Sequence, residues 1–138
     1  MPRRVRLIPV FLVLLTISGC LGGARNNAIR QAVVDEMLGT GTGLPQVLVV
    51  RMGPGEARAN FGFPGDTVFL YDAASEGEFW RLRKPHLEYL FIKEITYSDD
   101  SAQVEVEVIK RDSTEERLIY LNWVEGEWRV TSWERTKP

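Results

Sequence analysis

The chain holds one cysteine, Cys20, and the residues before it suggest what its thiol can do. An arginine-rich head is followed by an apolar run from Leu7 to Ile17, and the small residues Ser18 and Gly19 come directly before the cysteine. A basic head, an apolar stretch and small residues at a cleavage point are the parts of an export signal. The sequence therefore predicts cleavage next to the only thiol of the chain.

The four residues Ile17-Ser18-Gly19-Cys20 resemble the lipobox of bacterial lipoprotein signal peptides. In that family the cysteine thiol receives diacylglycerol, a dedicated peptidase cuts before it, and the new N-terminus is acylated. The resemblance implies that Cys20 is the lipidated first residue of the mature protein, held permanently in a membrane. It also implies that Leu21 favours the outer membrane if the source has two membranes, because Asp in that position tends to retain lipoproteins in the inner one.

A short transmembrane anchor with a free thiol is the alternative interpretation of residues 1–20. The apolar run of about 11 residues is well short of the roughly 20 that a helix needs to cross the hydrocarbon core. We therefore favour an exported lipoprotein anchored to the cell membrane. Lipidation would remove Cys20 as a nucleophile or disulfide partner, so the rest of the chain must be stabilised by its core.

The expected division is a signal peptide at 1–19, the lipidated cysteine with a short tether at 20–27, and one globular domain at 28–138. The signal peptide holds three of the 17 basic residues and no acidic one, which leaves 14 basic and 19 acidic residues and a formal charge of −5. This charge argues against nucleic acid as a partner. The tether reaches about 25 Å at most, so the domain is expected to lie close to the membrane.

The elements predicted for the domain give an α+β fold, in which one N-terminal helix packs on a curved, mostly antiparallel sheet. The helix is expected to run from a cap at Asn26 or Asn27 to Leu38. Its apolar face is expected to hold Ile29, Ala32, Val33 and Met37. From Pro45 onward the sequence is expected to form mainly strands.

Three short strands are expected, at residues 46–52, 56–63 and 67–71. Residues 73–84 fit a short helix that starts with a capping box of Ser75 and Glu78, or a hairpin, and we favour the hairpin. Four longer strands follow, at residues 87–98, 102–111, 116–125 and 128–135. Because the loops between these four are short, they predict an antiparallel meander.

The helix, the variable middle and the meander that ends in GEWRVTSWE, residues 126–134, resemble the small cone-shaped domains related to nuclear transport factor 2. Exported lipoproteins of that superfamily often end on a G-x-W-x-V strand, matched here by Gly126, Trp128 and Val130. The resemblance implies an NTF2-like or cystatin-like fold. A generic half-open sheet packed on one helix is the alternative.

Polar candidates for catalysis or metal binding are few. His86 is the only histidine, so no zinc site or mechanism within one chain can use a pair of histidines. Asp99 and Asp100 could hold a cation, but a polar hairpin tip explains them without one. We therefore name no catalytic residue and expect no metal, and no cofactor beyond the lipid on Cys20.

Large aromatic side chains are the other candidates for function. They can fill the core, which we favour, or line an apolar pocket for a lipid, a peptide or a small molecule. If they form a ligand-binding or partner-binding surface, its candidate residues are Trp80, Trp123, Trp128 and Trp133.

Together these patterns favour an envelope lipoprotein with a non-enzymatic binding domain, whose partners are the membrane, envelope proteins or a small apolar ligand. The alternative is a hydrolase or isomerase with a cone-shaped pocket that uses Asp66, Asp72 or His86 with a tyrosine. That alternative requires a carboxyl group of raised pKa in a closed pocket. A purely structural envelope role is the third candidate, and an exposed apolar patch without a pocket would favour it.

Overall fold

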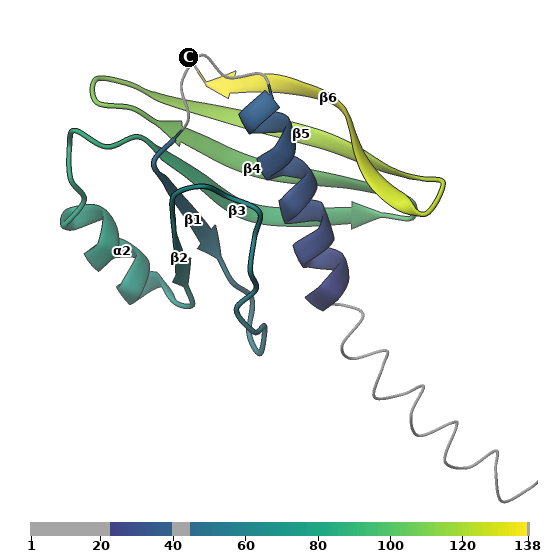
Figure 1. Cartoon of the computed structure of the whole chain (residues 1–138), viewed down its shortest axis with the longest axis horizontal. Coiled ribbons are helices and arrows are strands. Elements are labelled where there is room, and N and C mark those ends of the chain that lie inside the picture. The colour runs from purple at the N-terminus through teal and green to yellow at the C-terminus, as the bar shows by residue number, and fades with distance from the viewer. Residues whose placement is uncertain (1–22, 40–44, 138) are drawn as a thin grey trace, which may run out of the picture.

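The computed structural model describes residues 23–39 and 45–137 (Figure 1). The predictions made for the signal peptide, Cys20 and Leu21 lie outside the described residues. An N-terminal helix over residues 23–39 precedes six strands and a second, short helix, α2 (Ala73–Arg81). The predicted α+β class is therefore confirmed.

The strands form one open sheet in the order β2-β1-β3-β4-β5-β6. They are β1 (Val47–Arg51), β2 (Asp66–Leu70), β3 (Tyr89–Ser98), β4 (Ser101–Ile109), β5 (Thr114–Val124) and β6 (Glu127–Lys137). The last four form the predicted antiparallel meander. In contrast, β1 pairs in parallel with both of its neighbours, β2 and β3.

The N-terminal helix crosses one face of the sheet (Figure 1) and buries its apolar side there. Ile29, Val33 and Val34 have no exposed surface, and Ala32 and Met37 pack beside them. The sheet meets them with buried side chains of β1, β3, β4 and β5, among them Leu48, Leu90, Val104 and Ile119. The apolar face predicted for this helix is confirmed, with Val34 added to it.

The start of the helix differs from the prediction. Residues 23–25 are already helical, so Asn26 and Asn27 lie inside the helix and do not cap it. Because Ala24 and Arg25 have high helix propensity, extending the helix through them costs little free energy. The helix therefore includes residues 23–27, which we expected to form the tether.

The second helix lies at the β2–β1 end of the sheet (Figure 1). Its side chains pack on the face opposite the N-terminal helix. Trp80 packs there on Phe91 and Tyr89, with ring centroids 5.0 and 5.6 Å away, and Phe79 packs beside it. Because helices cover both faces here, the continuous apolar run from Leu90 to Ile92 is buried throughout. The N-terminal helix and α2 therefore enclose this part of the sheet from its two faces.

Two of the predicted elements are wrong. Residues 73–84 form α2 and a turn, not a hairpin, and the cap is Asp72, whose Oδ1 accepts a hydrogen bond of 2.7 Å from the N–H of Ser75. Residues 56–63 form an irregular loop, not a strand. This loop returns the chain from the end of β1 to the start of β2, as parallel pairing requires.

Candidate functional site

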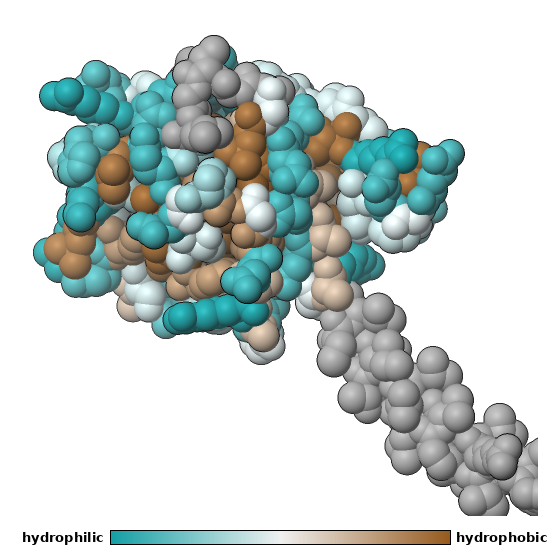
Figure 2. Space-filling view, in the orientation of Figure 1, coloured by the Kyte–Doolittle hydropathy of each residue, from teal (hydrophilic) through white to brown (hydrophobic). Residues whose placement is uncertain are grey.

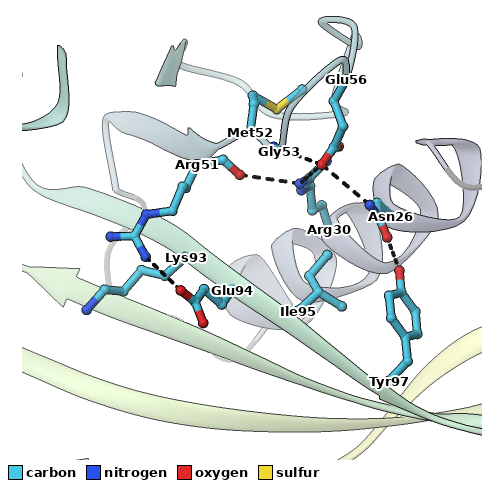
Figure 3. Close-up of a pocket in the computed structure, with 10 residues that line it drawn as sticks. All are labelled: Asn26, Arg30, Arg51, Met52, Gly53, Glu56, Lys93, Glu94, Ile95 and Tyr97. Atoms are coloured by element: carbon cyan, nitrogen blue, oxygen red, sulfur yellow. Dashed lines mark hydrogen bonds and ion pairs between the residues drawn. The ribbon is translucent and has the colours of Figure 1, made fainter. Parts of the chain in front are cut away.

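Two of the concave regions near the first turns of the N-terminal helix combine charged and aromatic side chains. The first is a polar cavity of about 310 Å³ between the helix, the loop after β1 and strand β3 (Figure 3). Three of its lining side chains are cations and two are carboxylates, namely Arg30, Arg51, Lys93, Glu56 and Glu94. We refer to it as the polar cavity.

Arg30 is the buried charge of the polar cavity, with 3% of its surface exposed. Its guanidinium forms a two-pronged ion pair with Glu56, with Nη1 2.5 Å from Oε2 and Nη2 3.2 Å from Oε1. It also donates to the carbonyl of Arg51 (Figure 3). A further hydrogen bond runs to the Oδ1 of Asn27. Arg30 therefore ties the helix to the end of β1 and to the loop after it.

The pKa of Glu56 reflects this contact. Burial alone would raise the pKa, but the hydrogen bonds from Arg30 and from the N–H of Gly53 outweigh burial and hold it below its ordinary value of 4.5. The Nε of Arg30 is buried and has no hydrogen-bond partner in the described part of the chain. Because its pKa is lowered, the carboxylate of Glu56 is ionised at neutral pH. It accepts hydrogen bonds from both Nη atoms of the buried guanidinium.

The other two cations of the polar cavity are also paired. Arg51 contacts Glu76 of α2, with Nη2 2.5 Å from Oε1, and lies 3.7 Å from Glu94. The hydrogen bonds that Arg51 donates to Glu76 raise the pKa of Arg51 against the effect of burial. Lys93 forms an ion pair with Glu107. Since the chain's own carboxylates neutralise all three cations, an anionic ligand would have to displace an existing partner.

Tyr97 lies between the polar cavity and the second concave region. Its hydroxyl donates a hydrogen bond to the Oδ1 of Asn26, and the guanidinium of Arg25 lies 3.9 Å above its ring. On the other side, the ring of Trp128 packs edge-on with its centroid 6.3 Å away. Burial raises the pKa of Tyr97, against the lowering effect of Arg25. The first turns of the helix are thus fixed to β3.

The second region is a groove of about 430 Å³ between the helix, the β3–β4 turn and the β5–β6 hairpin. We call it the tryptophan groove, and its lining residues are Ala24, Arg25, Ala28, Asp99, Asp100, Trp123 and Trp128. Each of the three elements that form it contributes at least two side chains.

Trp123 and Trp128 form a pair across the hairpin. They are directly opposite each other in β5 and β6, and their rings meet edge-on with centroids 5.5 Å apart. The tight turn between them has positive φ at both Glu125 and Gly126, a conformation suited to a short hairpin. Trp123 also donates a backbone hydrogen bond of 2.7 Å to the carbonyl of Asp100. The groove is therefore built on rigid strands, although Trp123 remains 46% exposed.

The charges of the tryptophan groove differ from those of the polar cavity. Within the described residues, the exposed carboxylates of Asp99 and Asp100 make no ion pair and no side-chain hydrogen bond. Arg25, which also lines the groove, is held over the Tyr97 ring. Aromatic faces and free carboxylates both attract cations. The groove is therefore suited to a cationic group that carries some apolar surface.

The structure brings two of the four predicted tryptophans together. Trp133 lies farther along β6, opposite Ile119, so it is on the helix side of the sheet with the pair. It is 41% exposed, and the guanidinium of Arg117 lies 4.2 Å from its ring centroid. Trp80 belongs to α2 and packs against the core on the opposite face of the sheet.

The residues of the enzymatic alternative are spread over the surface. Asp66 starts β2, Asp72 caps α2 and His86 lies in the segment before β3, and all three are exposed. Hydrogen bonds from Ser75 lower the pKa of Asp72, whereas a general acid at neutral pH needs a raised one. The enzymatic alternative required a carboxyl group of raised pKa in a closed pocket, and these three exposed residues do not provide one.

Sequence reasoning did not select Arg30, Arg25 or the small residues that line the groove. A signal for Arg30 was present, because this arginine adjoins Ile29 on a stripe that predicted burial. Arg25 and Ala24 carried no comparable signal, since they were assigned to the tether.

No protein family, curated protein or solved structure matches this chain. No helix within residues 23–39 and 45–137 is both long and apolar enough to cross a membrane. In the same residues, no group of three or more His, Cys, Asp or Glu side chains is placed to hold a metal ion.

Proposed function

We propose that this protein is a lipid-anchored component of a bacterial cell envelope, and that its domain binds a partner without catalysis through the tryptophan groove. The observation that carries the proposal is the position of this groove. It is lined by Ala24 and Ala28 of the first helical turns, and the lipobox cysteine lies only three residues before the described start of the helix.

The short connection limits where the domain can lie. Three extended residues span about 10 Å, less than half of the reach that an unstructured tether to residue 27 would allow. With diacylglycerol and an N-acyl chain on Cys20, the helix start would be confined next to the lipid headgroups. Confinement in one layer raises the effective concentration of the groove toward envelope proteins or apolar ligands in the same membrane. With Leu21 after the cysteine, we propose the outer membrane where the source has two.

A binding role accounts for the chemistry of the groove better than the two alternatives do. Indole rings on rigid strands, beside the carboxylates of a tight turn, can recognise a cationic ligand. On the face shown in Figure 2, hydrophobic surface forms separate patches between hydrophilic side chains, not the broad apolar area that a structural envelope contact would favour. The exposed Asp66, Asp72 and His86 do not support an enzyme.

The resemblance to domains related to nuclear transport factor 2 is retained as a proposal about ancestry. The N-terminal helix packed on a four-strand meander supports it. The parallel strand β1 and the placement of α2 on the opposite face are features that we did not expect from it. The binding proposal depends on the groove and the anchor, not on this kinship.

Intact mass of the protein extracted from its native membrane tests the anchor. The wild type should begin at residue 20 and carry added acyl mass, and Cys20→Ala should lose both features. Ser18→Ala keeps a small residue before the cleavage point and serves as the matched control, which should be processed like the wild type. An uncleaved or unlipidated wild type would refute the proposal.

A further inference from the structure

We propose that the tryptophan groove binds the ammonium headgroup of zwitterionic phospholipids in the membrane that holds the anchor. The domain would then rest on its own membrane with the β5–β6 hairpin at the lipid interface. This inference rests on the proposed lipid anchor, and it identifies the ligand of the same groove.

The first argument is access. The groove is lined by Ala24 and Ala28, so one of its walls is the part of the helix closest in sequence to Cys20. About 10 Å of extended chain is the most that separates the acylated residue from the start of the helix that forms this wall. Lipid headgroups are therefore the ligands present beside the groove at all times and at the highest local concentration.

The second argument is the aromatic pair. A cation over an indole face is stabilised by about 0.5–2 kcal/mol, and recognition of ammonium groups by aromatic cages uses this attraction. Trp123 and Trp128 present their rings at 65° to each other, so that they offer two differently directed walls. Tryptophan is also enriched at membrane interfaces, because its ring is apolar and its N–H is polar.

The third argument is charge. Asp99 and Asp100 lie on the rim without an ion-pair partner among the described residues. At the tip of the hairpin, Arg129 is matched by Glu127 at 2.8 Å and by Glu125 at 3.7 Å, and Arg25 lies on Tyr97. The groove lining therefore holds two carboxylates against the single guanidinium of Arg25, a balance that favours an ammonium group over an anionic headgroup. This is the opposite of the basic clusters that bind anionic lipids.

The polar cavity is a weaker candidate for a headgroup. Its cations Arg30, Arg51 and Lys93 are already paired with carboxylates of the chain, so a phosphate would have to break those pairs. The tryptophan groove needs no such exchange, and its volume of about 430 Å³ is within the usual range for small-ligand pockets.

The test uses the full lipidated protein, with acylation of Cys20 verified by intact mass, reconstituted into vesicles whose acyl chains are brominated. Bromine quenches tryptophan fluorescence at short range, so quenching reports rings at the interface. We expect strong quenching in phosphatidylcholine or phosphatidylethanolamine vesicles, and loss of most of it in phosphatidylglycerol vesicles.

Three variants assign the effect to the groove. The first variant is Trp123→Phe, and the second combines Asp99→Asn with Asp100→Asn. Each should lose most of the difference in quenching between zwitterionic and anionic vesicles. Asn accepts the positive φ of Asp99, so the turn is preserved. Trp133→Phe is the matched control, because it removes an exposed tryptophan of the same sheet face outside the groove, and the lipid preference should remain. Circular dichroism checks that each variant is folded.

Equal quenching in all vesicles, or a lipid preference that survives the groove variants, would overturn the inference. Absence of quenching from every vesicle by a protein of verified acylation would also overturn it, and would point to a protein as the occupant while the proposed function stands. A Cys20 without lipid would overturn both the inference and the proposed function.

Discussion

The guanidinium of Arg30 and the carboxylate of Glu56 form a nearly buried ion pair across 26 residues of sequence. Arg30 is on the N-terminal helix, whereas Glu56 lies in the irregular loop after β1. A loop of this kind gains little stability from its own backbone. The ion pair therefore holds the loop against the helix and makes this contact the most sensitive point of the polar cavity.

Arg30→Met keeps an apolar stem and removes the charge. We expect it to lower the free energy of unfolding by about 3–5 kcal/mol, because Glu56 is left without its partner. Adding Glu56→Gln should recover part of the loss, as a double-mutant cycle in denaturant would show. The exposed pair Glu78–Arg81 is the control, and Arg81→Met should cost less than about 1 kcal/mol. A loss from Arg30→Met no larger than the control's would contradict the role given to this pair.

Stability should fall in acid through Glu56. Its pKa is lower in the folded protein than the ordinary value of 4.5, so its contribution is complete above that value and is lost as the pH falls through the folded pKa. Glu56→Gln should flatten this part of the profile of unfolding free energy against pH. Part of the dependence on pH should remain in this variant, because Arg117 also lowers the pKa of Glu115. A profile unchanged by Glu56→Gln would show that the carboxylate is not stabilised as described.

Two glycines should respond in opposite directions to the same substitution. A Cβ on Gly65 would lie 2.1 Å from the carbonyl oxygen of Gln46, whereas a Cβ on Gly77 meets nothing within 4 Å. Gly77 lies inside α2, where Ala is better by about 0.5–1 kcal/mol. We therefore expect thermal unfolding to shift upward in Gly77→Ala and downward in Gly65→Ala. Shifts of the same sign would argue against the described packing of either residue.

The cap of α2 can be tested with a pair of aspartates. Asp72→Ala removes the acceptor for the N–H of Ser75 and should shift the denaturation midpoint to a lower denaturant concentration. Asp66 is equally exposed and caps no helix, so Asp66→Ala should stay within about 0.5 kcal/mol of the wild type. Chemical denaturation of both variants makes the comparison. Equal effects would mean that Asp72 does not act as the cap.

The meander and the apolar face of the first helix were predictable because local patterns determine them. Val104 and Val106 alternate with glutamates along β4, and one face is indeed buried. Ile29 and Val33 are one helical turn apart and share the core. In these elements each residue's environment follows from its near neighbours in sequence.

The middle of the chain was less predictable because distant residues determine its structure. The pattern of residues 56–63 does not reveal that Glu56 forms an ion pair with Arg30. It also does not reveal that β1 has parallel partners on both sides. Phe79 and Trp80 read as strand-forming aromatics, but Tyr89 and Phe91 provide the surface on which they pack as a helix. Tertiary packing thus overrode local preference.

The candidate site was predictable only in part for the same reason. The sequence placed Trp123 and Trp128 on the two sides of a predicted turn at Gly126, and the structure pairs them directly. Nothing local placed Ala24 or Asp100 beside them, since those contacts join the helix and a different turn to the hairpin.

The parallel pairing of β1 also bears on the order in which the protein can fold. All strand partners of Val47–Arg51 lie later in the chain, at residues 66–70 and 89–92. Ribosomes synthesise the N-terminal residues first, so this apolar segment emerges before any strand that can shield it. An unpaired strand of this kind invites aggregation. We therefore expect β1 to stay unpaired until β2 and β3 have been made, and the β3 edge of the meander then offers it a partner strand.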